Sequence, residues 1–404
     1  MTRLTQHQNY SQVIQEINCQ FGAQKVVVYL DYNASAPIRP EVADSINLAI
    51  NRCGNPSSIH EAGRIARQEV EKARAAVASL VSGNSRSVTF TSGATEANNQ
   101  ILVGTAEKNQ SIDVIITSSI EHPSLLIPAT TASIPCRLVP VGNEGTIDLN
   151  VLADLLAQHE GRALVSIMWA NNETGVIQPI EEAAELAHRF GALFHSDAAQ
   201  AVGKIPVDMA RTGVDALSIS AHKLGGATGV GAVVVRPGID LKPLIRGGGQ
   251  ENRLRAGTEN VPGIVGFGTA AALAKSDIVE SSSISSLRNR MEAAISSIGG
   301  GDITVHGKRS PRLPNTSCIS TRLIRSETQV IALDLAGCAV SSGAACSSGK
   351  VERSHVLTSM GLPESKVKTA IRISLGWGTT QEDVDQLVGA WSKMYRRVVH
   401  SSAA

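Results

Sequence analysis

The chain has 404 residues, of which 42% are hydrophobic and 18% charged, enough for one large hydrophobic core and a second, smaller one. Its 37 basic and 36 acidic side chains leave a formal net charge of +1, which argues against nucleic acid or an anionic membrane as a partner. Six cysteines without a C-x-x-C pair suit neither a disulfide framework nor a zinc site, so we expect no metal. The polar start, 1–25, and the lack of a long apolar run predict a cytoplasmic protein without a membrane span.

The predicted elements begin with a strand-like run at 26–30 and two helical patterns, one from Arg39 and one over 60–80. Apolar, β-branched runs then alternate with helical periodicity. These runs are 87–91, 113–117, 137–141, 163–169, 192–195, 216–220 and 230–235. Such alternation is typical of a largely parallel sheet with helices on both faces. A short Gly-rich stretch joins the last two runs, so we expect that pair to be antiparallel or not adjacent, and the sheet to be mixed.

Beyond about residue 275 the pattern changes to that of a smaller α+β domain. It predicts a helix around 287–298, strands near 315–320 and 370–374, and a last helix that opens with a capping box from Thr379 to Glu382. The serine-rich stretch 281–286 is interpreted as a loose surface between domains. We therefore predict a large α/β domain at 38–275 and a small domain made of 1–37 and 276–404.

A lysine at the end of a buried type of strand is the first candidate for chemistry. Lys223 comes shortly after the predicted strand 216–220, next to Ser220 and His222. Buried lysines are rare without a partner, and one functional reason for such a position is an imine with an aldehyde cofactor. Taken alone, an exposed loop lysine is the commoner interpretation.

Asp197 changes that interpretation. It lies 26 residues before Lys223, at the end of another strand of the buried type. A carboxylate there can keep a pyridinium nitrogen protonated, so that the ring withdraws electrons from the α-carbon of a substrate. An isolated aspartate at a strand end usually caps a helix. The pair of Asp197 and Lys223 therefore favours a cofactor site.

Small polar residues at 91–96 mark a point where a strand turns into a helix. Backbone N–H groups and the Thr95 hydroxyl would face an anion at the helix N-terminus, as in a phosphate cradle, although such residues also form ordinary tight turns. The spacing of the glycines excludes the two common nucleotide-binding motifs. Gly343 and Gly349 have five residues between them instead of the four of a P-loop, and no G-x-G-x-x-G follows the first strand.

These segments belong to an ordered series of motifs. The others are 30–33 (LDYN), 55–57 (NPS), 119–122 (SIEH), 171–175 (NNETG) and 255–258 (RAGT). Over about residues 28–390 the chain resembles the cysteine desulfurases among the class V, fold-type I enzymes that use pyridoxal 5'-phosphate (PLP). The resemblance implies the fold-type I PLP-dependent transferase fold, with a mixed, mostly parallel sheet and a smaller α+β domain. It also implies L-cysteine as substrate and an active site at a homodimer interface.

The resemblance implies a role for each matching residue. Lys223 would bind the cofactor aldehyde, Asp197 would pair with the pyridinium nitrogen, and His122 would stack on the ring. Further contacts would come from Asn172 and Gln200 near the ring's 3-oxygen, and from Ala94, Thr95, Ser220 and His222 around the phosphate. Thr258 would reach the phosphate of the partner subunit. Without the resemblance, His122 would be a capping or core histidine and Asn172 a turn residue.

The loop 341–350 holds Cys346 among small residues, unlike the buried, inert thiol that a lone cysteine usually is. As a thiolate it could attack the sulfur of cofactor-bound cysteine, which leaves a persulfide on the protein and releases alanine. The loop resembles the desulfurase group with a long Ser-rich cysteine loop. It departs from the commoner pattern at Ala344 and Ala345, where Ser-Ala is usual, and at Ser347, where Thr is frequent.

Arg372, in the predicted strand 370–374, matches the family's arginine for the substrate carboxylate, with Asn172 as a second substrate contact; a surface arginine on an edge strand is the alternative. We therefore predict a cysteine desulfurase that passes sulfur from Cys346 to acceptors such as iron–sulfur cluster assembly proteins. A selenocysteine lyase, β-lyase or aminotransferase would not need Cys346. A scaffold protein or a nucleotide-binding oxidoreductase would carry no cofactor on Lys223.

Overall fold

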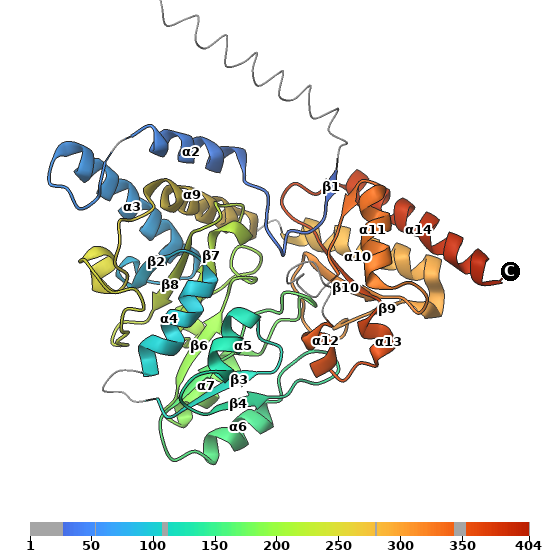
Figure 1. The fold of residues 1–404 in the computed structure, drawn as a ribbon, viewed down its shortest axis with the longest axis horizontal. Coiled ribbons are helices and arrows are strands. Elements are labelled where there is room, and N and C mark those ends of the chain that lie inside the picture. The colour runs from blue at the N-terminus through green and yellow to red at the C-terminus, as the bar shows by residue number, and fades with distance from the viewer. Residues whose placement is uncertain (1–26, 53, 107–111, 279–280, 343–352, 404) are drawn as a thin grey trace, which may run out of the picture.

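The computed structural model describes residues 27–52, 54–106, 112–278, 281–342 and 353–403 (Figure 1). A seven-stranded sheet forms the centre of the larger part. Its strands are β2 (Val88–Thr91), β3 (Val114–Ser118), β4 (Cys136–Val139), β5 (Ala163–Ser166), β6 (Leu193–Asp197), β7 (Ala216–Ser220) and β8 (Gly231–Val235). Their order is β2-β8-β7-β6-β5-β3-β4, and all neighbours are parallel except that β8 is antiparallel to both β2 and β7. The mixed sheet and its adjacent antiparallel pair confirm the prediction.

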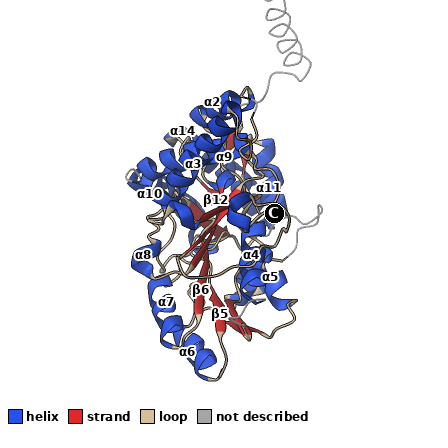
Figure 2. Ribbon diagram, turned by 90° about the vertical axis from the view of Figure 1, so that its left-hand side faces the viewer, coloured by secondary structure: helices blue, strands red, loops and turns tan. Residues whose placement is uncertain are grey.

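Helices cover both faces of this sheet (Figure 2). One face carries α6 (Leu149–Ala157), α7 (Ile180–Arg189) and α8 (Met209–Thr212), and the other carries α4 (Ala94–Ala106) and α5 (Pro123–Thr130). Successive strand residues therefore enter different cores: Val165 packs in the cluster of α6 and α7, whereas Leu164 packs in that of α4 and α5. Burial on both faces explains why the strands are continuous apolar runs.

Three further helices join the first of these cores over β2 and β8. They are α2 (Pro40–Ile50), α3 (Glu61–Leu80) and α9 (Val261–Asp277). The His60 side chain caps α3 by accepting from the Gly63 N–H, and apolar residues three or four apart, such as Val70, Ala73 and Val77, form its buried face. A glycine allows α9 to approach α3 closely, because a Cβ at Gly268 would lie 2.5 Å from Ala73 Cα.

A smaller part, orange to red in Figure 1 apart from the blue β1, has a hydrophobic cluster of its own. Its strands are β1 (Val28–Tyr29), parallel to β11 (Cys338–Ala339), and the antiparallel set β12 (Ala370–Ser374), β10 (Thr316–Ser320) and β9 (Thr304–Val305). Its helices are α10 (Ser281–Gly299), α11 (Ser326–Leu335), α12 (His355–Ser359), α13 (Glu364–Val367) and α14 (Gln381–Ala403). Trp391, stacked on Tyr395 with 4.9 Å between ring centroids, lies in this cluster. The domain bounds 38–275, and 1–37 with 276–404, stay a prediction.

Short single-turn segments complete the chain: η1 (Ser85–Ser87), η2 (Ala221–Lys223), η3 (Gln250–Arg253) and η5 (Gly300–Asp302). No helix of the described ranges is long and apolar enough to cross a lipid bilayer.

Two predicted details are wrong. The serine-rich stretch 281–286 is the start of α10, where the hydroxyls of Ser285 and Ser286 donate to the Ser282 carbonyl and so accommodate serine within a helix. The capping box of α14 lies one residue later than predicted. Thr380 Oγ1 accepts from the Asp383 N–H at 3.2 Å and Asp383 Oδ2 accepts from the Thr380 N–H at 2.8 Å, while Thr379 Oγ1 accepts from the Gly376 N–H.

A buried ion pair ties α3 to the η3 turn. Arg74 Nη1 and Nη2 donate to the two carboxylate oxygens of Glu251 at 2.7 and 2.8 Å, and the Phe90 N–H donates to the same carboxylate at 2.8 Å. The two side chains are 7% and 3% exposed. Removal of one partner from such a pair leaves an uncompensated buried charge, which is much costlier than the loss of an exposed pair.

We expect Glu251→Gln to lower the free energy of unfolding by about 3 kcal/mol, because Arg74 loses its buried counter-charge and keeps only the more exposed Glu71. Urea unfolding followed by circular dichroism measures the change. Asp385→Asn, which breaks an exposed pair with Arg290 (N–O 3.0 Å), is the matched control and should have little effect. Equal effects of the two substitutions would contradict the expectation.

Candidate active site

The carboxyl ends of several parallel strands create the site. Because β8 is antiparallel to both its neighbours, β2 runs in the same direction as β3, β5, β6 and β7, and the segments after these five strands meet at one edge of the sheet. A cavity of about 370 Å³ lies at this edge. The predicted site residues that line it are Ala94, Thr95, His122, Asn172, Asp197, Gln200, Ser220, His222 and Lys223.

Three predicted residues do not line this cavity. Arg372 lies behind it, buried on the edge strand β12, with Nη1 donating to the Asn172 carbonyl at 3.2 Å and Nη2 to Asp31 Oδ1 at 2.7 Å. At 6% exposure it is not the surface arginine of the alternative interpretation. Thr258 is exposed and also lies outside the cavity. Cys346 falls outside the described residues, as does its loop after residue 342.

Lys223 ends the η2 turn, directly after β7. Its Nζ donates to the carbonyls of Asn33 and Ala34 at 2.6 and 2.8 Å. Burial, reinforced by the charge of Arg372 and opposed by Asp197, lowers the pKa of Lys223 to about 8. About one amine in ten is then uncharged at pH 7, compared with roughly one in 2,500 at the usual pKa of about 10.4. The uncharged amine is the form that attacks a carbonyl carbon.

Asp197 is held rigidly at the end of β6. Its Oδ2 accepts from Asn98 Nδ2 on α4 at 2.8 Å, and its Oδ1 accepts from the Ala199 N–H at 2.9 Å. The second bond forms a turn two residues long, so the aspartate does not cap a helix. A fixed, buried carboxylate on the cavity wall suits a positively charged partner in the cavity.

His122 both caps α5 and lines the cavity. Its Nδ1 accepts from the Ser124 N–H at 3.1 Å, so the neutral ring carries its proton on Nε2. Burial lowers the pKa of His122, although Asp197 partly offsets this effect, and the imidazole is therefore neutral near pH 7. His122 therefore caps α5, as it would without the resemblance, and it also lines the cavity.

The phosphate cradle predicted from 91–96 forms at the N-terminus of α4, where Ala94 is the first helical residue. The Thr95 and Ser220 hydroxyls make no hydrogen bond with any described residue, so both are free to donate into the cavity that they line. The one nearby carboxylate in the first turn of α4, that of Glu96, is paired with a cation: Arg255 Nε donates to its Oε1 at 3.0 Å. The positive helix end with free hydroxyls fits a bound anion.

Asn33 is a site residue to which the sequence assigned no role. Its backbone N–H donates to Ser374 Oγ at 3.0 Å, and its Nδ2 donates to the Asn172 carbonyl at 3.1 Å and to Thr316 Oγ1 at 2.9 Å. Its carbonyl accepts from Lys223 and also from Gln200 Nε2 at 3.0 Å. These bonds join the cavity wall to β10 and β12. Residues 30–33 (LDYN) form one of the motifs on which the family resemblance rests, but the motif itself does not indicate these contacts with β10 and β12.

Glu121, next to His122, was also missed. Its Oε1 accepts from Ser118 Oγ at 2.6 Å and from the Met168 N–H at 2.8 Å, while Oε2 has no partner within the described part of the chain. Burial raises the pKa of Glu121 to about 8, so the side chain carries a proton at neutral pH. It therefore adds no negative charge beside His122.

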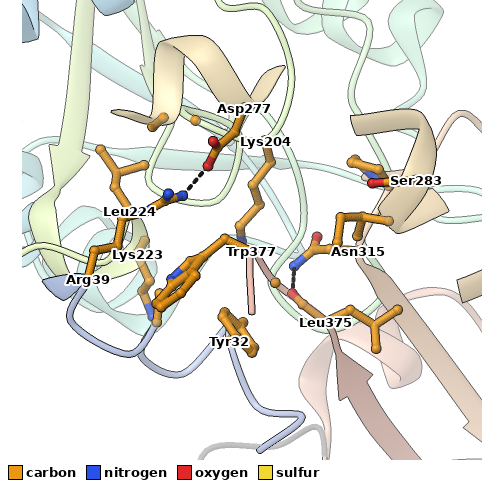
Figure 3. Close-up of a pocket in the computed structure, with 16 residues that line it drawn as sticks. Tyr32, Arg39, Lys204, Lys223, Leu224, Asp277, Ser283, Asn315, Leu375 and Trp377 are labelled. Atoms are coloured by element: carbon orange, nitrogen blue, oxygen red, sulfur yellow. Dashed lines mark hydrogen bonds and ion pairs between the residues drawn. The ribbon is translucent and has the colours of Figure 1, made fainter. Parts of the chain in front are cut away.

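A second cavity, of about 190 Å³, adjoins Lys223 from the other direction (Figure 3). Lys204, four residues after Gln200, lines it together with Lys223. Arg39 also lines it, paired with Asp277 and with its guanidinium carbon 5.0 Å from the centre of the Trp377 ring. Lys223 thus reaches the walls of both cavities.

Comparison with known proteins decides the family. The family model for class-V aminotransferases matches residues 28–387. A cysteine desulfurase of Cereibacter sphaeroides is 42% identical over 367 residues, which are 89% of this chain and 94% of that protein. The chain belongs to the cysteine desulfurases of the class-V aminotransferase family.

Two further relatives agree. Cysteine desulfurase IscS of Dictyoglomus turgidum is 40% identical over 92% of this chain and 95% of its own length. Among solved structures, a NifS-like protein from Rickettsia africae has a TM-score of 0.84 at 36% identity and covers 92% of this chain and 99% of that one. The predicted family, fold class and desulfurase function are confirmed.

In the ligand-free desulfurase we expect an amine-directed reagent to label Lys223 with a pH midpoint near 8, because burial disfavours its charged form. Arg372→Met should raise this midpoint, since it removes a neighbouring positive charge and leaves Asp31 without its partner. Mass spectrometry of the labelled peptide across a pH series measures both. The exposed Arg290→Met serves as control. A midpoint near 10.4 in the unaltered protein would contradict the expectation.

Proposed function

We propose that this cysteine desulfurase binds pyridoxal 5'-phosphate in the cavity at the strand ends, with Lys223 as its covalent attachment. The convergence of Lys223, Asp197 and His122 on one cavity carries the proposal. The cavity volume lies within the range of about 300–1,000 Å³ of small-molecule sites. Asp197 would pair with the pyridinium nitrogen and His122 would lie on the ring.

The phosphate would be held by the N-terminus of α4 with the free hydroxyls of Thr95 and Ser220, beside Ala94 and His222. His222 suits this place as a hydrogen-bond donor or acceptor rather than as a cation, because burial and the charge of Lys223 lower its pKa to about 4. Asn172 and Gln200, which line the same cavity, would contact the ring's 3-oxygen.

When bound, the pyridoxal ring supplies an electron sink for the α-carbon of the substrate. Arg372 would hold the substrate carboxylate, with Asn172 beside it. Its Nε has no partner among the described residues but is buried, so the carboxylate would have to replace the bonds from the Nη groups to Asp31 or to the Asn172 carbonyl. Lys223 Nζ, with its pKa near neutrality, would take the α-proton, in concert with His122, and later return a proton to carbon.

Cys346 would take the sulfur. Its thiolate attacks the substrate sulfur, a sulfur–sulfur bond forms, and the carbon–sulfur bond breaks with its electron pair on carbon, which gains a proton to give alanine. Cysteine and thiol thus become alanine and persulfide without another oxidant. Ser341, five residues earlier, pairs its backbone with that of Arg372 at 3.1 and 2.8 Å. Five residues span at most about 18 Å, which is the farthest that Cys346 can lie from this anchor.

The described cysteines are poor alternatives. Cys318 and Cys338 are buried, and burial raises the pKa of the Cys318 thiol far above its ordinary value. Cys136 lies on β4 at the edge of the large sheet and does not line the cavity.

We further propose a cytoplasmic homodimer that passes the persulfide sulfur to an acceptor such as an iron–sulfur assembly scaffold. Thr258 would reach the phosphate in the partner subunit's site, and its exposure supports this role. Exposed apolar side chains on α2 and α3, among them Leu48 and Ile65, are available for a subunit contact.

With PLP bound and L-cysteine added, we expect the peptide that holds Cys346 to gain one sulfur atom and alanine to accumulate. Cys346→Ser should keep the yellow cofactor but lose both products, because the hydroxyl is a far weaker nucleophile for sulfur. Mass spectrometry and amino-acid analysis measure the outcome, with Cys136→Ser as control. Alanine and sulfide at the unaltered rate in Cys346→Ser would show that another group takes the sulfur.

Arg372→Lys should raise the KM for cysteine roughly ten- to hundred-fold, with a smaller change in kcat, because a lysine keeps the charge but lacks the planar fork that binds a carboxylate. Steady-state alanine formation gives both constants, and the exposed Arg290→Lys is the control. An unchanged KM would rule out Arg372 as the carboxylate contact.

A further inference from the structure

Lys204 is a second lysine that contacts the wall of the active-site cavity from behind. Its Nζ donates to Gln200 Oε1 at 2.6 Å and to Asn33 Oδ1 at 2.8 Å. Lys204 and Lys223 both line the second cavity, where Figure 3 labels them, whereas Gln200 lines the first. The proposed roles of the site residues make no use of Lys204.

These bonds decide which end of the Gln200 amide is available to a ligand. An amide oxygen only accepts hydrogen bonds and an amide nitrogen only donates them. Lys204 engages Oε1, and Nε2 gives one of its two hydrogens to the Asn33 carbonyl at 3.0 Å. The second hydrogen of Nε2 is left for an atom in the cavity, which therefore meets a donor.

When protonated, Lys204 also adds a positive charge to a region that already holds several. The charged and titratable groups around it are Lys223 and His222 on η2, Arg372 on β12, Asp31 and Tyr32 after β1, Asp197 on β6, and Asp277 on α9 with its partner Arg39 before α2. Burial, together with the charges of Lys223 and Arg372, lowers the pKa of Lys204. A negatively charged ligand atom next to Gln200 would favour the protonated lysine again.

We propose that Lys204 is a positioning residue, which presents the Gln200 N–H to the 3-oxygen of the bound ring and places a positive charge behind that contact. The inference rests on the proposed cofactor site. It has a spectroscopic consequence, since a positive charge there disfavours a proton on the nitrogen that links Lys223 to the cofactor. Removal of the charge should raise the pH at which the visible absorbance of the bound cofactor changes.

The test is an absorbance titration of the PLP-loaded protein. Lys204→Met should raise the midpoint by about one pH unit and Lys204→Gln should raise it as well, whereas Lys204→Arg, which keeps the charge, should stay within a few tenths of the unaltered protein. The control is Lys275→Met, because Lys275 Nζ bonds a carbonyl and a hydroxyl of Ser79 on the surface, away from the site.

A second set of variants tests whether the effect passes through Gln200. In a Gln200→Leu background, Lys204→Met should shift the midpoint by clearly less than in the unaltered protein, because only the through-space effect of the lysine charge remains and the part that acts through the oriented Gln200 N–H is gone. An equal shift in both backgrounds would overturn the positioning role. Should Lys204→Met fail to fold, Lys204→Gln, which keeps N–H donors, replaces it in both backgrounds.

The outcomes separate this inference from the function on which it rests. If the unaltered protein binds no PLP, the proposed cofactor site is wrong. If it binds PLP and titrates, but Lys204→Met and Lys204→Gln titrate like the unaltered protein, only the role of Lys204 is wrong. A loss of thermal stability in all Lys204 variants without a midpoint shift would show a purely structural lysine, which also overturns the inference.

Discussion

Burial of the Lys223 amine is the constraint on which the rest of the site depends. A lysine removed from water needs acceptors, and the sheet that carries Lys223 offers none at this point. Both acceptors are carbonyls of Asn33 and Ala34, about 190 residues earlier in the chain. That segment is held in place by the pairing of β1 with β11 and by Ser374 on β12. The small sheet must therefore be in position before the lysine of the large sheet is satisfied.

Asn33 makes this dependence mutual. Every polar atom of its side chain and backbone is bonded, and its partners come from the cavity wall, from β10 and from β12. A buried network in which every member is satisfied fixes one arrangement of the chains around it. The two hydrophobic cores are separate, but the polar junction between them is specific. The site lies where this junction meets the strand ends.

The large sheet and part of the site were predictable from the sequence, because both follow from local patterns. Apolar runs bounded by turn residues predict the strands, and Asp197 and Lys223 lie at or just after the ends of two of these runs. Parallel strands bring such residues to one edge whatever the details of packing. What pattern analysis could not supply are contacts that depend on tertiary packing. The bonds of Asn33, the burial of Arg372 against Asp31 and the proton on Glu121 all require groups from distant segments.

Lys204 shows where a local signal was present but was not used. It follows Gln200 by four residues, a spacing that often brings side chains together in a turn. A lysine directly after a glycine, however, is usually interpreted as part of a surface loop. The predicted position of the α14 capping box was wrong for a related reason. Thr379 and Thr380 are chemically equivalent, and only the backbone conformation decides which of them caps the helix.

Arg372 connects the chemistry to the small sheet. Its side chain bonds the Asn172 carbonyl at the cavity wall, while its backbone pairs with Ser341, from which the chain continues toward Cys346. One residue thus fixes the group that would bind the substrate carboxylate and the start of the segment that would deliver the thiol. Because β12 also anchors Asn33 through Ser374, any displacement of this strand would loosen the carboxylate contact, the cysteine segment and the carbonyl that holds Lys223 together. If Arg372 and Cys346 have the roles proposed for them, the binding of cysteine and the transfer of its sulfur would be linked through β12.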